Sequence, residues 1–205
     1  MLPHDSFTTN TVRSHVSSLD EGDATMRGSD DIVAALEKAA RAGSLSACFV
    51  LGRLYDEGWG VSHSSRTAAR WYLRAGEGGL PEAFYFIATA FAAGDGVAPD
   101  QKRALFWYRK AAAAGDRDAV YALAVATLEG YGVRKNEPRG LRSLTAVARH
   151  QPIAMEYLAY HYLKQGRLSL AKKWATRAAK RGVDSARQLL AKIDNATNSD
   201  GVHQS

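Results

Sequence analysis

The sequence has little of what covalent, metal or cofactor chemistry requires. Its 205 residues contain one cysteine, Cys48, so no disulfide can form within the chain, and we expect a buried, inert thiol there. The six histidines show no zinc-ligand spacing, and neither an HExxH run nor a nucleophile elbow is present. We therefore predict no catalytic residues, no metal, no cofactor and no enzymatic activity.

Long apolar runs are also missing. No stretch approaches the roughly 20 apolar residues that cross a bilayer, which predicts a chain without a membrane span. The first ten residues, MLPHDSFTTN, lack the basic and apolar regions of a signal peptide. We expect a cytoplasmic protein on these grounds.

Acidic residues are scarce in the C-terminal third. Residues 134–194 carry fourteen Lys and Arg against four Asp and Glu, a net charge of +10, whereas residues 31–133 are balanced at eleven of each sign. A solvated helical face is the simpler interpretation of such a basic segment, and an acidic partner is the alternative.

What the chain does contain is a repeat. A Gly-x-Gly-Val tetrapeptide occurs at Gly58–Val61, Gly94–Val97 and Gly130–Val133, at a constant interval of 36 residues. An interval of this length is typical of stacked helical repeats. Two glycines also occur in phosphate loops, but the lysine, the hydroxyl and the preceding strand of a P-loop are absent here. We interpret the tetrapeptide as a structural turn that ends one helix and begins the return.

Each repeat unit contains two helices. The first carries a bulky-small-bulky stripe at i, i+4, i+8, with Leu51, Ile87, Leu123 and Leu158 as its bulky anchors. The second carries a Trp-Tyr pair in the first two repeats, and a lone tryptophan in the fourth. We assign structural roles, with each tryptophan as a wedge between repeats, to Gly58, Gly60, Trp71, Tyr72, Gly94, Gly96, Trp107, Tyr108, Gly130, Gly132 and Trp174.

These patterns predict an all-α chain of one repeat domain with disordered ends. The arm covers residues 1–29, the repeat array 30–194 and the tail 195–205, both ends being polar and without apolar periodicity. Within the array we expect a capping half-repeat at 30–43, full repeats at 44–79, 80–115, 116–151 and 152–182, and a capping helix at 183–194. The third repeat has Ser143-Leu144 in place of the aromatic pair, and the fourth lacks the Gly-x-Gly-Val turn.

The combined pattern Ala-x3-Leu-Gly-x2-Tyr-x2-Gly-x-Gly-Val, followed by Ala-x2-Trp-Tyr-x-x-Ala-Ala-x2-Gly, resembles the Sel-one-like repeat, a relative of the tetratricopeptide repeat. The resemblance covers about residues 31–194, is strong in the first two repeats and partial in the others. It implies a right-handed α-solenoid of antiparallel helix pairs that serves as a scaffold or adaptor for protein–protein interaction. Bacterial members of the family occur in signalling, in host interaction and as immunity proteins paired with toxins.

The first helices of such an array line its concave groove, where variable positions contact the partner. We take ten candidate partner-binding residues from the positions two before, two after and six after the anchors. They are Phe49, Arg53, Glu57, Tyr85, Thr89, Tyr121, Val125, Glu156, Tyr160 and Lys164. Phe49, Tyr85 and Tyr121 would form an aromatic ladder, either as a binding surface or as filling between neighbouring helices.

Three functions are compatible with this sequence. The leading hypothesis is a non-enzymatic scaffold that binds a partner protein or peptide in the groove. A narrower alternative is a cytoplasmic immunity or regulatory protein that neutralises one toxin or enzyme. The third is nucleic-acid binding through the basic end, at Arg134, Lys135, Arg139, Arg142 and the segment from Lys164 to Arg181, although no recognised nucleic-acid module supports it.

Overall fold

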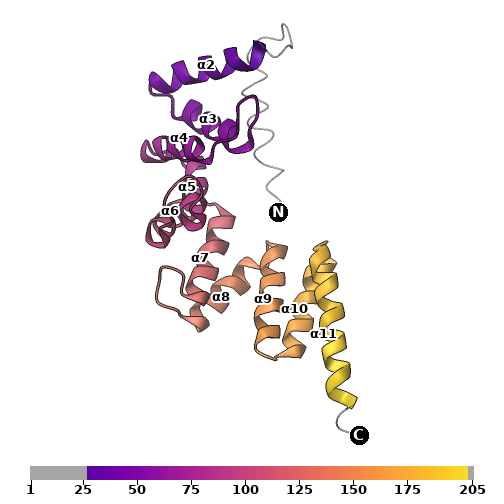
Figure 1. Cartoon of the computed structure of the whole chain (residues 1–205). Helices are drawn as coiled ribbons and strands as arrows, with labels where there is room; N and C mark the ends of the chain where they lie inside the picture. Colours follow the sequence, from indigo (N-terminus) through magenta and orange to yellow (C-terminus); the bar gives the residue numbers. More distant parts are fainter. Residues whose placement is uncertain (1–26, 203–205) are drawn as a thin grey trace. The chain divides into compact units, whose positions relative to one another are not determined.

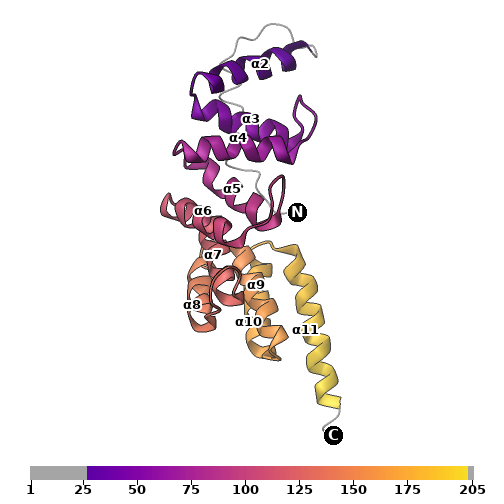
Figure 2. The same ribbon diagram turned by 60° about the vertical axis from the view of Figure 1, so that its left-hand side comes forward.

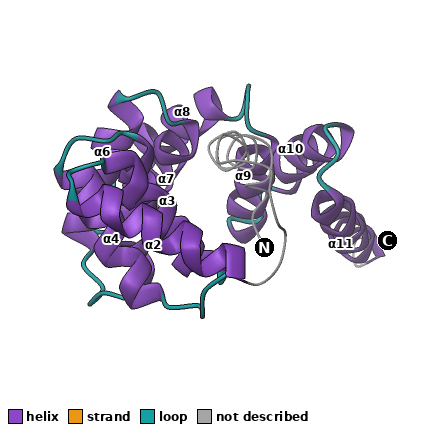
Figure 3. Ribbon diagram, turned by 90° about the horizontal axis from the view of Figure 1, so that it is seen from above, coloured by secondary structure: helices purple, strands orange, loops and turns teal. Residues whose placement is uncertain are grey.

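The computed structural model describes residues 27–202, which form ten helices, α2 to α11, and no strand (Figure 1; Figure 3). Side chains are described for residues 30–194. The predicted all-α, α-solenoid fold class is confirmed, since successive helices pair in sequence order through short connections. The helices divide into two compact units, residues 1–107 and 108–205, where the sequence predicted one continuous array. The boundary falls inside α6 (Gln101–Ala113).

The first unit contains α2 (Arg27–Arg41), α3 (Leu45–Glu57), α4 (Ser65–Glu77), α5 (Glu82–Ala93) and the start of α6. Helix α2 packs on α3, α3 on α4, and α4 on α5. The anchors Leu51 and Ile87 are buried in this unit. Trp107, predicted as a wedge between repeats, is buried against the Phe84 ring at a centroid distance of 5.6 Å and borders Gly76 of α4.

The second unit contains the rest of α6, α7 (Arg117–Glu129), α8 (Glu137–Val147), α9 (Pro152–Lys164), α10 (Leu168–Lys180) and α11 (Asp184–Val202). Helices α9, α10 and α11 lie side by side (Figure 1; Figure 2). Leu128, Leu144 and Leu158 form the fully buried centre, and half-buried Trp174 packs against the apolar clusters on both sides of α10. The anchor Leu123 is only partly buried.

Local sequence explains where these helices begin and end. Ser44, Ser64, Asp116 and Asn136 each accept a hydrogen bond from a backbone N–H in the first turn of the helix that follows. The first glycine of every Gly-x-Gly-Val turn is the left-handed residue after a first helix, as predicted, with φ between 71° and 89°. The turn is therefore structural.

Both outer boundaries differ from the sequence prediction. Helix α2 begins at Arg27, inside the arm assigned to 1–29, and α11 continues to Val202, well into the tail assigned to 195–205. Polarity alone did not mark these ends, because the sequence has no apolar periodicity at either of them. The remaining parts of the predicted arm and tail, 1–26 and 203–205, lie outside the described residues. No helix within 27–202 is long and apolar enough to cross a membrane.

Candidate partner-binding surface

The ten predicted groove positions differ widely in exposure. Half-buried positions are Phe49, Tyr85, Thr89, Tyr121 and Val125, and exposed ones are Glu57, Tyr160 and Lys164. Arg53 and Glu156 are buried, with 5% and 7% of their surface exposed, although the sequence placed both toward a groove. Burial of a charged side chain is unusual without a partner, so the surroundings of these two residues decide what the surface does.

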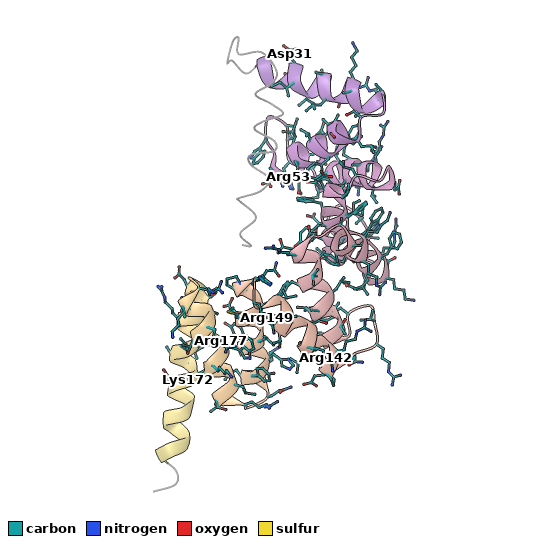
Figure 4. All side chains as sticks on the ribbon, turned by 180° about the vertical axis from the view of Figure 1, so that it is seen from behind. Asp31, Arg53, Arg142, Arg149, Lys172 and Arg177 are labelled. Carbon is teal, nitrogen blue, oxygen red and sulfur yellow. The ribbon has the colours of Figure 1, made fainter. Side chains whose placement is uncertain are left out.

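Arg53 is surrounded by rings and a carboxylate. Its Nη2 donates to Glu57 Oε1 at 2.9 Å, one helical turn along α3, and its guanidinium lies 5.1 Å from the Phe86 ring centroid and 5.8 Å from that of Trp59. Phe49 meets the edge of Phe86 with centroids 5.5 Å apart. We call Phe49, Arg53, Glu57, Trp59 and Phe86 the α3/α5 cluster. Figure 4 labels Arg53 at this place.

The Tyr72 ring supports this cluster from α4. It stacks on Phe86 with a centroid distance of 5.0 Å and donates its hydroxyl to Asp56 Oδ2 at 3.0 Å. Burial raises the pKa of the Tyr72 hydroxyl, and the neighbouring Asp56 carboxylate raises it further. Tyr72 therefore stays a neutral hydrogen-bond donor that fixes Phe86.

The second unit contains a matching arrangement. Tyr121 meets the edge of the Tyr157 ring with centroids 6.2 Å apart, and Tyr157 donates its hydroxyl to Glu129 Oε1 at 2.8 Å. Tyr131 lies near enough to contribute to the raised pKa of Tyr157, whose main cause is burial. We call Tyr121, Val125, Glu129, Tyr131 and Tyr157 the α7/α9 cluster. Its members come from α7, the turn after it and α9.

The predicted aromatic ladder is replaced by pairs that include residues the sequence analysis missed. Phe49 and Tyr85 both contact Phe86, and Tyr121 contacts Tyr157. Phe86 and Tyr157 each stand one residue before an anchor, not two. Trp59 and Tyr131 were also missed, although an aromatic residue between two turn glycines was a visible signal. Their exposed fractions, 43% and 56%, are large for such side chains.

Cations cover a different face of the second unit. Helix α10 contains Lys172, Lys173, Arg177 and Lys180, all exposed, and no acidic residue. Arg177 lies over the Trp174 ring, and Lys172 pairs with Asp194 Oδ1 at 2.7 Å (Figure 4). Exposed pairs of this kind contribute on the order of 0–1 kcal/mol to stability, so most of this charge is available to an acidic partner.

Two cavities of the first unit are smaller than a typical cofactor site. A cavity of about 130 Å³ lies between α3, α4 and α5, bordered by Asp56, Tyr72 and Thr89, and one of about 270 Å³ lies beside Trp71. Cofactor sites usually occupy about 300–1,000 Å³. No group of three metal-ligating side chains occurs within the described part of the chain. Cys48 is fully buried, and burial raises the pKa of its thiol, as expected of an inert cysteine.

Alkaline pH is expected to destabilise the fold from about pH 10 upward. The pKa values of Tyr108 and Tyr121 are raised to about 12, mainly by burial, and those of Tyr72 and Tyr157 are raised as well. Unfolded tyrosines ionise near pH 10. Above that pH the unfolded chain binds fewer protons than the folded chain, so the stabilisation present below pH 10 is lost as pH rises.

The melting temperature, followed by circular dichroism between pH 8 and 11.5, measures this loss. The Tyr72→Phe variant should show a shallower decline above pH 10 than the wild type. The variant Tyr160→Phe, changed at an exposed position, is the control and should keep the wild-type slope. Equal slopes in all three proteins would contradict the assignment.

Comparison with known proteins relates these repeats to one family. The family model for the Sel1 repeat matches residues 45–80, 81–116, 117–142 and 152–183. Its third match ends just before Ser143-Leu144, where the aromatic pair is absent. No curated protein matches the chain.

Solved structures give the same relationship. A Sel1 repeat protein from Oxalobacter formigenes superposes with a TM-score of 0.61 at 28% identity, over 73% of this chain and 61% of that one. The protective antigen c5321 of uropathogenic Escherichia coli, with an SLR fold, gives 0.63 at 26% identity, over 75% and 34%. Immunity protein Pa5087 from Pseudomonas aeruginosa gives 0.50 at 23%, over 90% and 70%. The chain thus spans less than two thirds of the length of the first two structures.

Proposed function

Since this chain belongs to the Sel1 repeat family, generally a non-catalytic interaction scaffold, we propose that it binds a partner protein or peptide through the first helices of its repeats. The observation that supports this function is the position of the exposed aromatic rings. Of the four exposed large aromatic side chains within the described residues, Trp59 and Tyr131 lie in the turns as members of the α3/α5 and α7/α9 clusters, and Tyr160 lies on α9. The fourth, Phe106, lies on the second helix α6. Aromatic and arginine side chains dominate the energetic centres of protein interfaces.

The distribution of charge favours binding at the first-helix face over binding of a nucleic acid at α10. The α3/α5 cluster combines rings with a paired arginine and carboxylate, which suits a peptide with both apolar and polar groups. The cationic face of α10 has no exposed ring on which a base could stack. Binding of a nucleic acid there would come from phosphate contacts alone, and its affinity would fall steeply with salt. That alternative is tested by a gel shift at low salt, which compares the wild type with the Lys173→Glu and Lys180→Glu variants.

Site-specific photo-crosslinking tests the proposed function. A photoreactive phenylalanine analogue is placed at Trp59 or Tyr131, and at Arg70 or Lys173 as exposed controls on second helices. We expect crosslinks to a captured protein at the two turn positions and only background at the controls. Equal labelling at Arg70 or Lys173 would overturn binding by the first-helix face.

Affinity for a partner identified in this way then tests the groove residues themselves. The double substitution Tyr85→Ala, Tyr121→Ala is expected to weaken binding at least tenfold, about 1.4 kcal/mol. Circular dichroism must show that the variant remains helical. The neutralisation of a toxin or enzyme is a narrower hypothesis, which a toxin or enzyme as the captured protein would favour.

A further inference from the structure

The α3/α5 and α7/α9 clusters are equivalent parts of different repeats. Phe49, Glu57 and Trp59 of the first repeat correspond to residues 72 positions later in the third, Tyr121, Glu129 and Tyr131. Phe86 and Tyr157 each stand one residue before the anchor of the next repeat. The edge-to-face pair recurs too, with interplanar angles of 63° for Phe49 and Phe86 and 85° for Tyr121 and Tyr157. Each unit therefore contains its own copy of one side-chain arrangement.

The copy in the first unit shows which group this arrangement binds. The Arg53 guanidinium lies over the faces of Phe86 and Trp59, and it pairs with Glu57. A planar guanidinium can stack on a ring and still donate in its plane, which an ammonium cannot do. Arg53 is thus an internal occupant, and its contacts define rings plus one carboxylate as an arginine site.

The α7/α9 cluster in the second unit keeps the rings and the carboxylate of this arrangement but lacks the arginine. Val125 stands at the position of Arg53, 72 residues later, so the chain supplies no cation from that place. Glu129 accepts a hydrogen bond from Tyr157, as the carboxylate member of the cluster. The rings of Tyr121, Tyr131 and Tyr157 are all present.

A second carboxylate strengthens this difference. Glu156 replaces Tyr85 at the position two before the anchor and is 93% buried, beside Tyr121. Within the described residues, no hydrogen-bond donor or cation pairs with its side chain. A guanidinium arriving there could pair with this carboxylate, whereas an apolar side chain would cover it without pairing and an anion would repel it.

The net charge of the surrounding segment does not oppose a cation at this site. Residues 134–194 are basic overall, but exposed charges are screened beyond about 8 Å at physiological ionic strength. Glu129, bonded to the Tyr157 hydroxyl, and Glu156, beside Tyr121, act inside that range. Local chemistry therefore decides the occupant.

We propose that the α7/α9 cluster, with Glu156, binds an arginine side chain of the partner. The guanidinium would lie on the Tyr157 ring and pair with Glu129 and Glu156, as Arg53 lies on Phe86 and pairs with Glu57. This inference rests on the proposed function for its biological occupant, but the chemistry of the site can be tested without a partner.

The probe is the blocked peptide acetyl-Gly-Gly-Arg-Gly-Gly-amide, titrated into the ¹⁵N-labelled full chain at constant ionic strength. We expect saturable amide shifts at Tyr121, Glu129, Glu156 and Tyr157. The citrulline peptide, which has the same shape without the charge, should bind at least fivefold more weakly. Equal responses to both peptides, or no shifts at these amides, would overturn the proposal.

Two variants make the test specific. Val125→Arg supplies the chain's own occupant, as in the first unit, and should weaken peptide binding at least tenfold without lowering the melting temperature. The isosteric Glu156→Gln should weaken it at least threefold, and Glu82→Gln, an exposed residue of the first unit, should leave it unchanged. Undiminished binding to both Val125→Arg and Glu156→Gln would contradict the site.

The proposal and the function can fail separately. If the arginine peptide binds as described but crosslinking finds no partner on the first-helix face, the site stands and the proposed function fails. If a partner crosslinks at Tyr131 but the arginine and citrulline peptides behave alike, the function stands and the arginine site fails.

Discussion

Replacing Gly96 with alanine is expected to destabilise the first unit by about 3 kcal/mol, from two separate costs. Gly96 has a φ of 71°, in the left-handed region where alanine is strained by about 1–2 kcal/mol. A Cβ at this position would also overlap the backbone carbonyl of Ser65, at the start of α4. Backbone cannot move aside as a flexible side chain can, so the turn would have to separate from α4.

The Gly79→Ala variant separates the two costs. Gly79 has a φ of 99°, but a Cβ there would meet nothing within 4 Å, so only the conformational strain of about 1 kcal/mol applies. Urea unfolding followed by circular dichroism gives the overall loss, and hydrogen exchange of the α4 amides locates it. Equal losses in Gly96→Ala and Gly79→Ala would show that the contact with Ser65 contributes nothing.

Replacing Gly52 with alanine is expected to cost about 2 kcal/mol, although alanine is the better helix former by about 1 kcal/mol. A Cβ on Gly52 would lie 2.5 Å from two carbons of the Tyr72 ring. That ring is buried, stacked on Phe86 and held by Asp56, so it cannot turn away. The clash outweighs the gain in helix propensity.

The third repeat shows how the same position accepts a methyl group. Ala124 stands for Gly52 there, and Leu144 stands for Tyr72, both of them buried. Adding Tyr72→Leu to Gly52→Ala should therefore cost less than the sum of the two single changes, with a coupling energy of about 1 kcal/mol or more. The four proteins of this double-mutant cycle are compared by urea unfolding. Additive losses would mean that Gly52 is small for a reason other than the Tyr72 ring.

The sequence predicted the helical organisation well because the same helix and turn signals recur in successive repeats. The 36-residue interval, the anchors and the turn glycines predicted the order of helices α3 to α8. The N-cap residues stand directly before the helices that they cap. The outer ends were less accurate, since neither the start of α2 at Arg27 nor the extension of α11 to Val202 has an apolar pattern to mark it. The division at Trp107 and Tyr108 had no signal in the repeat at all.

The candidate surface was predicted only in outline. The positions two from each anchor included Phe49, Arg53, Tyr121 and Glu156, which do lie in or beside the clusters. Adjacent residues on a helix are about 100° apart, so periodicity alone could not decide between Tyr85 and Phe86 as the ring that meets Phe49. The separation of Arg53 and Glu57 by four residues was a visible sign of their pairing. Burial of Arg53 was not visible, because Phe86 and Trp59 reach it from other elements.

The sequence by itself determined that the chain is a series of Sel1-type helix pairs, because local periodicity and turn chemistry suffice for that. Tertiary structure decided which rings, carboxylates and cations meet. The close approach permitted by Gly52 sets how Tyr72 supports Phe86, and that placement forms a site for Arg53 in one unit. In the other unit the equivalent site has Val125, with Glu129 and Glu156 as carboxylates. A difference of one residue between repeats becomes a binding prediction only when its neighbours in space are known.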